Sequence, residues 1–199
     1  VYSEAWGHIS QVLDNDDITY ALGDASNAYS GTPSPQWLQR FIAENVDWYK
    51  HVDDKSLQTY KRHLVFVRPS TIIIYDELAA NKAADWDWRI HTPNEMQLTE
   101  AGATTNNASG RGVLRLFTSK PFVSSLTDKA LQKPFNVDGR TVKVKGKTDI
   151  YNDIGWHYSA KITGAKNARV LALIDVSNEN DKPATVKELG DGTIQVGDV

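Results

Sequence analysis

The chain has 199 residues, of which 40% are hydrophobic, with no cysteine and a formal net charge of −3 at pH 7. That length gives one domain enough apolar surface for a substantial core. The slight acidity argues against a nucleic-acid-binding protein, which needs a broad basic surface. No apolar run approaches the roughly 18 residues of a membrane span. We therefore expect one domain over residues 1–199, with no nucleic acid and no membrane among its partners.

The first quarter of the chain predicts a hairpin followed by a helix. Residues 8–13 and 18–23 have strand composition, and the Asp and Asn residues between them favour a turn. Ser34 is a suitable N-cap, and Pro35 fits the first position of a helix. The apolar spacing that follows predicts one short helix near residues 35–45.

The remainder of the chain predicts strand after strand. Residues 60–68, 71–77 and 169–176 are apolar on both faces, so we expect them to be central strands. Short segments with turn residues between them are typical of an all-β antiparallel β-sandwich. The other predicted strands are residues 85–92, 95–99, 112–117, 121–126, 141–145, 155–163, 185–189 and 193–196.

Residues 85–92 show the clearest alternation in the sequence. Trp86, Trp88 and Ile90 should face the core, whereas the intervening polar side chains should lie on the opposite face. Those polar side chains suit a sugar-binding surface, because Asp and Arg bond hydroxyl and carboxylate groups. The candidate substrate-binding residues are Asp87, Arg89 and His91. The alternative is a solvated sheet face with cross-strand ion pairs. The acidic and basic side chains on this face favour that alternative.

His157 is the second histidine of interest. It alternates with the aromatic residues Trp156 and Tyr158, as His91 alternates with the tryptophans of its own strand. If the two strands are neighbours, the two histidines can meet. No third ligand has suitable spacing, so we expect no metal site, and no sequence motif indicates a cofactor.

Four segments resemble the β-sandwich region of heparinase II/III-like polysaccharide lyases. They are residues 23–29 (GDASNAY), residues 60–69 (YKRHLVFVRP), residues 72–77 (IIIYDE) and residues 88–91 (WRIH). Their order and spacing match a "GDAS-x-AY" segment, an "R-x-hydrophobic" strand, a "VVD" strand and a "W-x-x-H" strand. The match covers residues 18–92.

This resemblance implies a parent enzyme that cleaves uronate-containing glycans by β-elimination, in the periplasm or outside the cell. In such lyases an N-terminal α/α toroid carries much of the acid–base machinery, and a His-rich segment that binds a structural metal precedes the "GDAS-x-AY" motif. The 199 residues contain neither, so we assign no catalytic residue. The expected partners are an acidic polysaccharide and the missing toroid of the parent chain. The competing hypothesis is a non-catalytic carbohydrate-binding or structural sandwich, in which Trp86, Trp88 and Trp156 stack on sugars.

Overall fold

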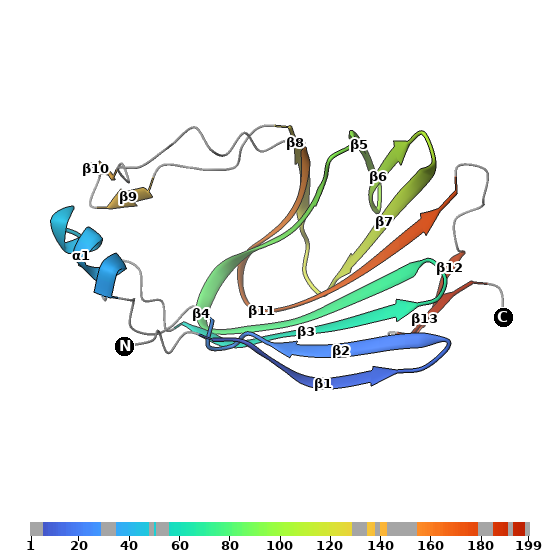
Figure 1. Cartoon of the computed structure of the whole chain (residues 1–199), viewed down its shortest axis with the longest axis horizontal. Helices are drawn as coiled ribbons and strands as arrows, with labels where there is room; N and C mark the ends of the chain where they lie inside the picture. The colour runs from blue at the N-terminus through green and yellow to red at the C-terminus, as the bar shows by residue number, and fades with distance from the viewer. Residues whose placement is uncertain are drawn as a thin grey trace.

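One antiparallel sheet of nine strands dominates the chain (Figure 1). The structure is a computed structural model that describes residues 6–28, 35–47, 50, 56–128, 135–137, 140–142, 155–178, 185–190 and 193–197. The strand order is β1-β2-β3-β4-β11-β7-β6-β5, and β8 pairs with β11 beside this path. The strands of this sheet are β1 (His8–Asp14), β2 (Ile18–Asp24), β3 (Leu57–Val67), β4 (Thr71–Thr92), β5 (Met96–Thr99), β6 (Gly102–Asn107), β7 (Gly110–Thr118), β8 (Val123–Thr127) and β11 (Trp156–Ser177).

Two small hairpins and one helix complete the described elements. β9 (Phe135–Val137) pairs with β10 (Arg140–Val142), and β12 (Val186–Gly190) pairs with β13 (Thr193–Val196). The predicted strand over residues 141–145 overlaps the end of β10. Its residues after Val142 lie outside the described part of the chain. The all-β antiparallel class and the single short helix are confirmed.

The sandwich arises because two long strands bend. β4 and β11 each contain 22 residues and pair along most of their length. Their register shifts between Ile162 and Asn167, where Gly164 has a φ of 65°, a left-handed conformation that favours glycine. Figure 1 shows both strands curving strongly midway, which turns one sheet into two facing layers.

This bend corrects the predicted strand boundaries. Residues 71–77 and 85–92, predicted as two strands, are the two halves of β4, and residues 155–163 and 169–176 are the two halves of β11. The stretch between the halves of β4 is rich in alanine and carries Asn81 and Lys82, so the apolar alternation fades there although the backbone stays extended. β6 was not predicted, because its Gly and Asn residues are typical of turns.

Central strands and core agree with the sequence. β3, β4 and β11 lie in the middle of the strand order, as their two apolar faces predict. Trp88, Tyr158 and Ile162 are at most 7% exposed, in one core cluster where the two layers face each other. Trp86 and Ile90 pack against this cluster, so the predicted inward face of residues 85–92 is confirmed.

The helix α1 (Pro35–Ala43) ends as its sequence suggests. Asn45 has a φ of 53° and lies just beyond the last turn. The amides of Asn45 and Val46 donate to the carbonyls of Ile42 and Phe41. Val46, 4% exposed, also packs on Phe41. This is a Schellman motif with its hydrophobic contact, which stops the helix at this point.

Candidate functional site

A buried polar cluster ties the two layers together. Arg62 on β3 and Asp76 on β4 are directly opposite each other, and the guanidinium donates two hydrogen bonds of 2.7 Å to the carboxylate. Trp88, from the far half of β4, donates its indole N–H to the same carboxylate at 3.0 Å. The Asp76 side chain is 2% exposed and that of Arg62 is 41% exposed. The cluster therefore presents one half-exposed guanidinium backed by a buried carboxylate.

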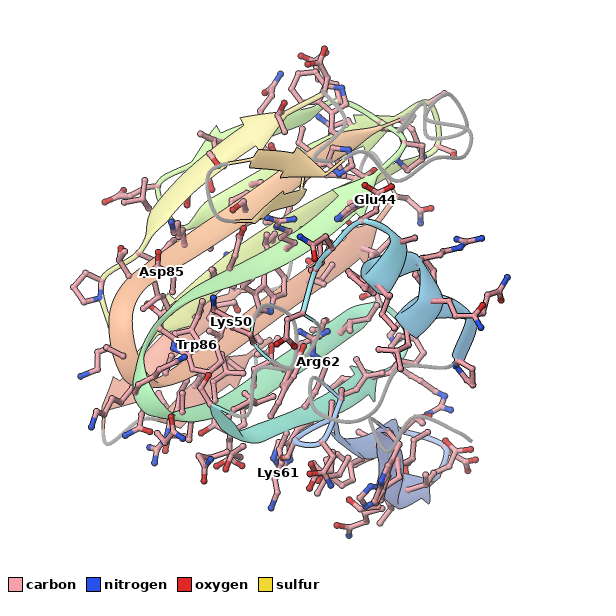
Figure 2. All side chains as sticks on the ribbon, turned by 90° about the vertical axis from the view of Figure 1, so that its left-hand side faces the viewer. Glu44, Lys50, Lys61, Arg62, Asp85 and Trp86 are labelled. Atoms are coloured by element: carbon pink, nitrogen blue, oxygen red, sulfur yellow. The ribbon has the colours of Figure 1, made fainter. Side chains whose placement is uncertain are left out.

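A cleft of about 500 Å³ opens beside this cluster. It lies where β3 and the two halves of β4 come together. Figure 2 shows this side of the molecule and labels three residues that line the cleft, Arg62, Asp85 and Trp86. Ligand pockets of small molecules span about 300–1,000 Å³, so one or two sugar rings fit this volume. Its polar lining comprises Ser56, Tyr60, Arg62, Asp76, Asp85, Asp87 and Arg89.

A ladder of ion pairs occupies the polar face of β4 and β11. Arg89 donates its Nε to Asp87 at 2.8 Å, and the hydroxyl of Ser159 donates to the same carboxylate. Burial raises the pKa of Asp87, but the hydrogen bonds from Arg89 and Ser159 and the nearby positive charges of Arg89 and Lys161 outweigh it, so the net pKa is lowered. Lys161 bonds to Asp85 at 3.0 Å and holds the pKa of that carboxyl below its ordinary value.

The two histidines of this face meet, as the sequence suggested. His91 and His157 are cross-strand partners, and their Nδ1 atoms are 2.8 Å apart. His157 is 3% exposed whereas His91 is exposed. Neither is among the described residues that line the cleft. Of the three predicted substrate-binding residues, the structure brings Asp87 and Arg89 to the cleft and places His91 farther along the same face.

Three tryptophans lie in the layer formed by the second half of β4 and the first half of β11. They are unsuited to stacking on sugars. Trp88 is 7% exposed, and Trp86 and Trp156 are partly buried against the same core cluster. The indole N–H of Trp86 donates to the carbonyl of Ala165 at 2.8 Å. These side chains stabilise the sandwich, as the structural interpretation expects.

Sequence reasoning missed Arg62 and Asp76 as site residues. Each is a charged residue directly beside a stretch that is apolar on both faces, residues 64–67 in β3 and residues 72–75 in β4, and this is the signal that marks them. A charge is rarely buried without a partner, so such positions predict an ion pair. The identity of the partner depends on strand register, which the sequence alone does not give.

A second series of hydrogen bonds lies on the opposite face of β2, β3 and β4, and no sequence pattern predicted it. The hydroxyl of Tyr20 bonds to Nδ1 of His63 at 3.0 Å, and Nε2 of His63 bonds to Glu77 at 3.0 Å. The His63 side chain is 26% exposed and that of Glu77 is 40% exposed. These two hydrogen bonds link three neighbouring strands and fix the orientation of the His63 imidazole ring.

Metal and membrane features are limited in the described part of the chain. Among those residues, no three His, Cys, Asp or Glu side chains are grouped closely enough to hold a metal ion between them. The helix found there is neither long nor apolar enough to cross a membrane.

Comparison with solved structures decides what this sandwich resembles. A crystal structure of heparinase III matches 96% of the chain with a TM-score of 0.58 and 12% identity. Heparan sulfate lyase HepC from Pedobacter heparinus matches 96% of it with a TM-score of 0.58 and 5% identity. The chain has the β-sandwich fold of the heparinases. No family model and no curated protein matches the sequence.

The heparinase-like sandwich is only part of those enzymes. The chain spans 26% of the length of the heparinase III structure, and the same share of the HepC chain. The resemblance read from the sequence is confirmed at the level of fold.

Proposed function

We propose that this chain is the sandwich portion of a polysaccharide lyase that cleaves uronate-containing glycans by β-elimination. The observation that carries the proposal is the cleft with Arg89 at its rim, in a chain that has the heparinase fold. The similar proteins are described as heparinase III and heparan sulfate lyase. A periplasmic or secreted location accompanies this proposal, since acidic polysaccharides are extracellular substrates.

Arg89 is the residue proposed to bind the glycan carboxylate or sulfate. Its described bonds to Asp87 use Nε and Nη2, and a guanidinium has five N–H donors in all. Asp87 holds the guanidinium in place, so little side-chain entropy is lost when an anion binds. Asp85 and Asp87 offer acceptors for sugar hydroxyls beside it. The role predicted for His91 stays a prediction, since it does not line the cleft.

Binding of a heparan sulfate tetrasaccharide by isothermal titration calorimetry tests the proposal. Arg89→Ala should weaken the affinity about ten- to a hundred-fold, because one charge-assisted hydrogen bond is worth about 1.5–3 kcal/mol. Arg111→Ala, at the far end of β7, is the matched control and should bind as the wild type does. Equal affinities for the two variants would contradict the proposal.

The second candidate function is a structural sandwich without a glycan site of its own. The burial of Trp88 and the complete pairing of Asp85 and Asp87 with cations favour it. In that case the tetrasaccharide does not bind to the wild-type chain. Turnover by the full-length parent would then be the same with Arg89→Ala as without it.

A further inference from the structure

A group of basic side chains lies on the outer face of the sheet, where β11 bends. Arg169 follows the bend and alternates with residues of the core cluster, so its side chain points away from the core. Lys120 comes shortly after the end of β7. The amide of Ser119 donates to the carbonyl of Arg169 at 3.0 Å, and the amide of Arg169 donates to the hydroxyl of Ser119 at 2.9 Å. These two bonds hold Lys120 beside β11, close to Lys166 in the bend.

The basic side chains line a polar groove, which consists of two adjoining hollows of about 440 and 390 Å³. Lys120 and Asn167 line both hollows, so the two are continuous. The groove lies at the bend, where the register of β11 on β4 shifts. We call it the outer groove, and its cationic, hydroxyl and amide groups come from Thr59, Ser119, Lys120, Lys166, Asn167 and Arg169.

The cations of the outer groove differ from other basic side chains of the same sheet. Four of those others have carboxylate partners: Arg62 with Asp76, Arg68 with Asp14, Arg89 with Asp87 and Lys161 with Asp85. Lys120, Lys166 and Arg169 are exposed, and none of the three has an ion pair among the described residues.

One acidic residue lines the outer groove, and it already has a partner. Glu77 is opposite Arg169 in the register, but its carboxylate bonds to His63 at 3.0 Å. Asp85 accepts the amide of Gly164 at the bend and is paired with Lys161. The groove therefore has a net positive charge, and its cations are available to an anion from solution.

We propose that the outer groove binds a glycan chain that carries sulfate or carboxylate groups, at a place separate from the cleft with Arg89. The proposal rests on the proposed function for the class of glycan. Cations distributed along a groove match anionic groups carried on successive sugars, and the hydroxyl and amide groups between them match sugar hydroxyls. Each hollow is within the size range of small-ligand pockets, about 300–1,000 Å³.

The groove is a weak, salt-sensitive site for a short glycan. Its cations are exposed, and salt screens exposed charges over a Debye length of about 8 Å at 0.15 M ionic strength. One exposed charge pair contributes little by itself. A long polymer can engage the groove and the cleft together, which raises its overall affinity above that of either site. The groove would thus keep a polysaccharide on the protein between cleavage events.

Nuclear magnetic resonance of the ¹⁵N-labelled chain with a heparan sulfate tetrasaccharide tests the proposal. The amides of Lys120, Asn167 and Arg169 should shift and saturate. Lys120→Gln/Arg169→Gln removes two exposed charges without burying or uncovering apolar surface, so the fold should stay intact. It should weaken the affinity at the groove about three- to tenfold, because each exposed pair is weak.

Two further variants control for charge and for folding. Arg111→Gln/Lys187→Gln removes the same charge from the far end of β7 and from β12, and it should retain the wild-type affinity at the groove. Lys166→Gln is a single change in the bend and should weaken that affinity about twofold. An unchanged affinity in both groove variants, or an equal loss in the control, would overturn the proposal.

Arg89→Ala separates this proposal from the proposed function. It should reduce the shifts around the cleft and leave those of the groove unchanged. Groove binding without any binding at the cleft would contradict the cleft as a glycan site and would support the outer groove. Tripolyphosphate is the probe for charge alone, and it should bind the groove more weakly than the tetrasaccharide. Equal affinities for the two would overturn the assignment to a glycan.

Discussion

Trp88 donates its indole N–H to Asp76 at 3.0 Å, although the two residues are on opposite halves of the bent strand β4. The bond links the two layers of the sandwich from within one strand. Asp76 is 1% exposed and Trp88 is 7% exposed, so the bond is shielded from water. A shielded bond to a charged group contributes more than an exposed one.

Loss of the guanidinium that neutralises Asp76 should destabilise the protein strongly. Arg62→Met leaves a buried carboxylate without its cation, which costs about 3–5 kcal/mol in comparable pairs. The double variant Arg62→Met/Asp76→Leu should regain much of this loss, since no buried charge remains. Urea unfolding of Arg62→Met, of Asp76→Leu and of the double variant measures the effect. A double variant as unstable as Arg62→Met would show that packing rather than charge sets the cost.

Two substitutions at Trp88 separate its hydrogen bond from its packing. Trp88→Phe removes the donor to Asp76 and should cost about 1–3 kcal/mol. Trp88→Ala also removes the whole buried ring and should cost about 3–5 kcal/mol. Trp37→Ala is the control, because Trp37 is 48% exposed on α1. Chemical denaturation followed by circular dichroism gives the three values, and equal costs for Trp88→Phe and Trp88→Ala would assign the whole effect to the hydrogen bond.

The sequence predicts the elements of this fold better than it predicts their continuity. Period-2 alternation placed Trp86, Trp88 and Ile90 inward and His91 outward, because each strand has one face in the core. Residues 80–84 carry no such contrast, so the sequence did not show that β4 runs through the bend. The cleft arises from this bend, and its Arg62–Asp76 pair arises from the register of β3 on β4. Both depend on contacts between distant segments, which local patterns do not encode.

Acid should weaken the protein partly through Asp87. The folded-state pKa of this carboxyl is lowered, with burial opposing the hydrogen bonds from Arg89 and Ser159. Its stabilising contribution is therefore present above the unfolded pKa of about 3.9 and is lost as the pH falls through the folded pKa. Asp87→Asn should flatten the fall in unfolding free energy between about pH 5 and pH 2. Urea titrations of wild type and variant at several pH values in this range provide the comparison, and identical slopes would refute the coupling.

Residues 1–199 by themselves should release no unsaturated uronate ends from heparin, heparan sulfate or alginate. Elimination needs a positioned base and acid, and each such group contributes about 10²–10⁴-fold to the rate. The carboxylates of the cleft are held in ion pairs, and Tyr60 is the single Tyr or His among the described residues that line it. Tyr158 is unsuitable as a base, because burial raises its pKa while its hydroxyl bonds to Ser124 at 2.9 Å. Ultraviolet absorbance of the unsaturated product gives the measurement. Activity that vanishes in Tyr60→Phe would instead make Tyr60 catalytic and the chain an enzyme in its own right.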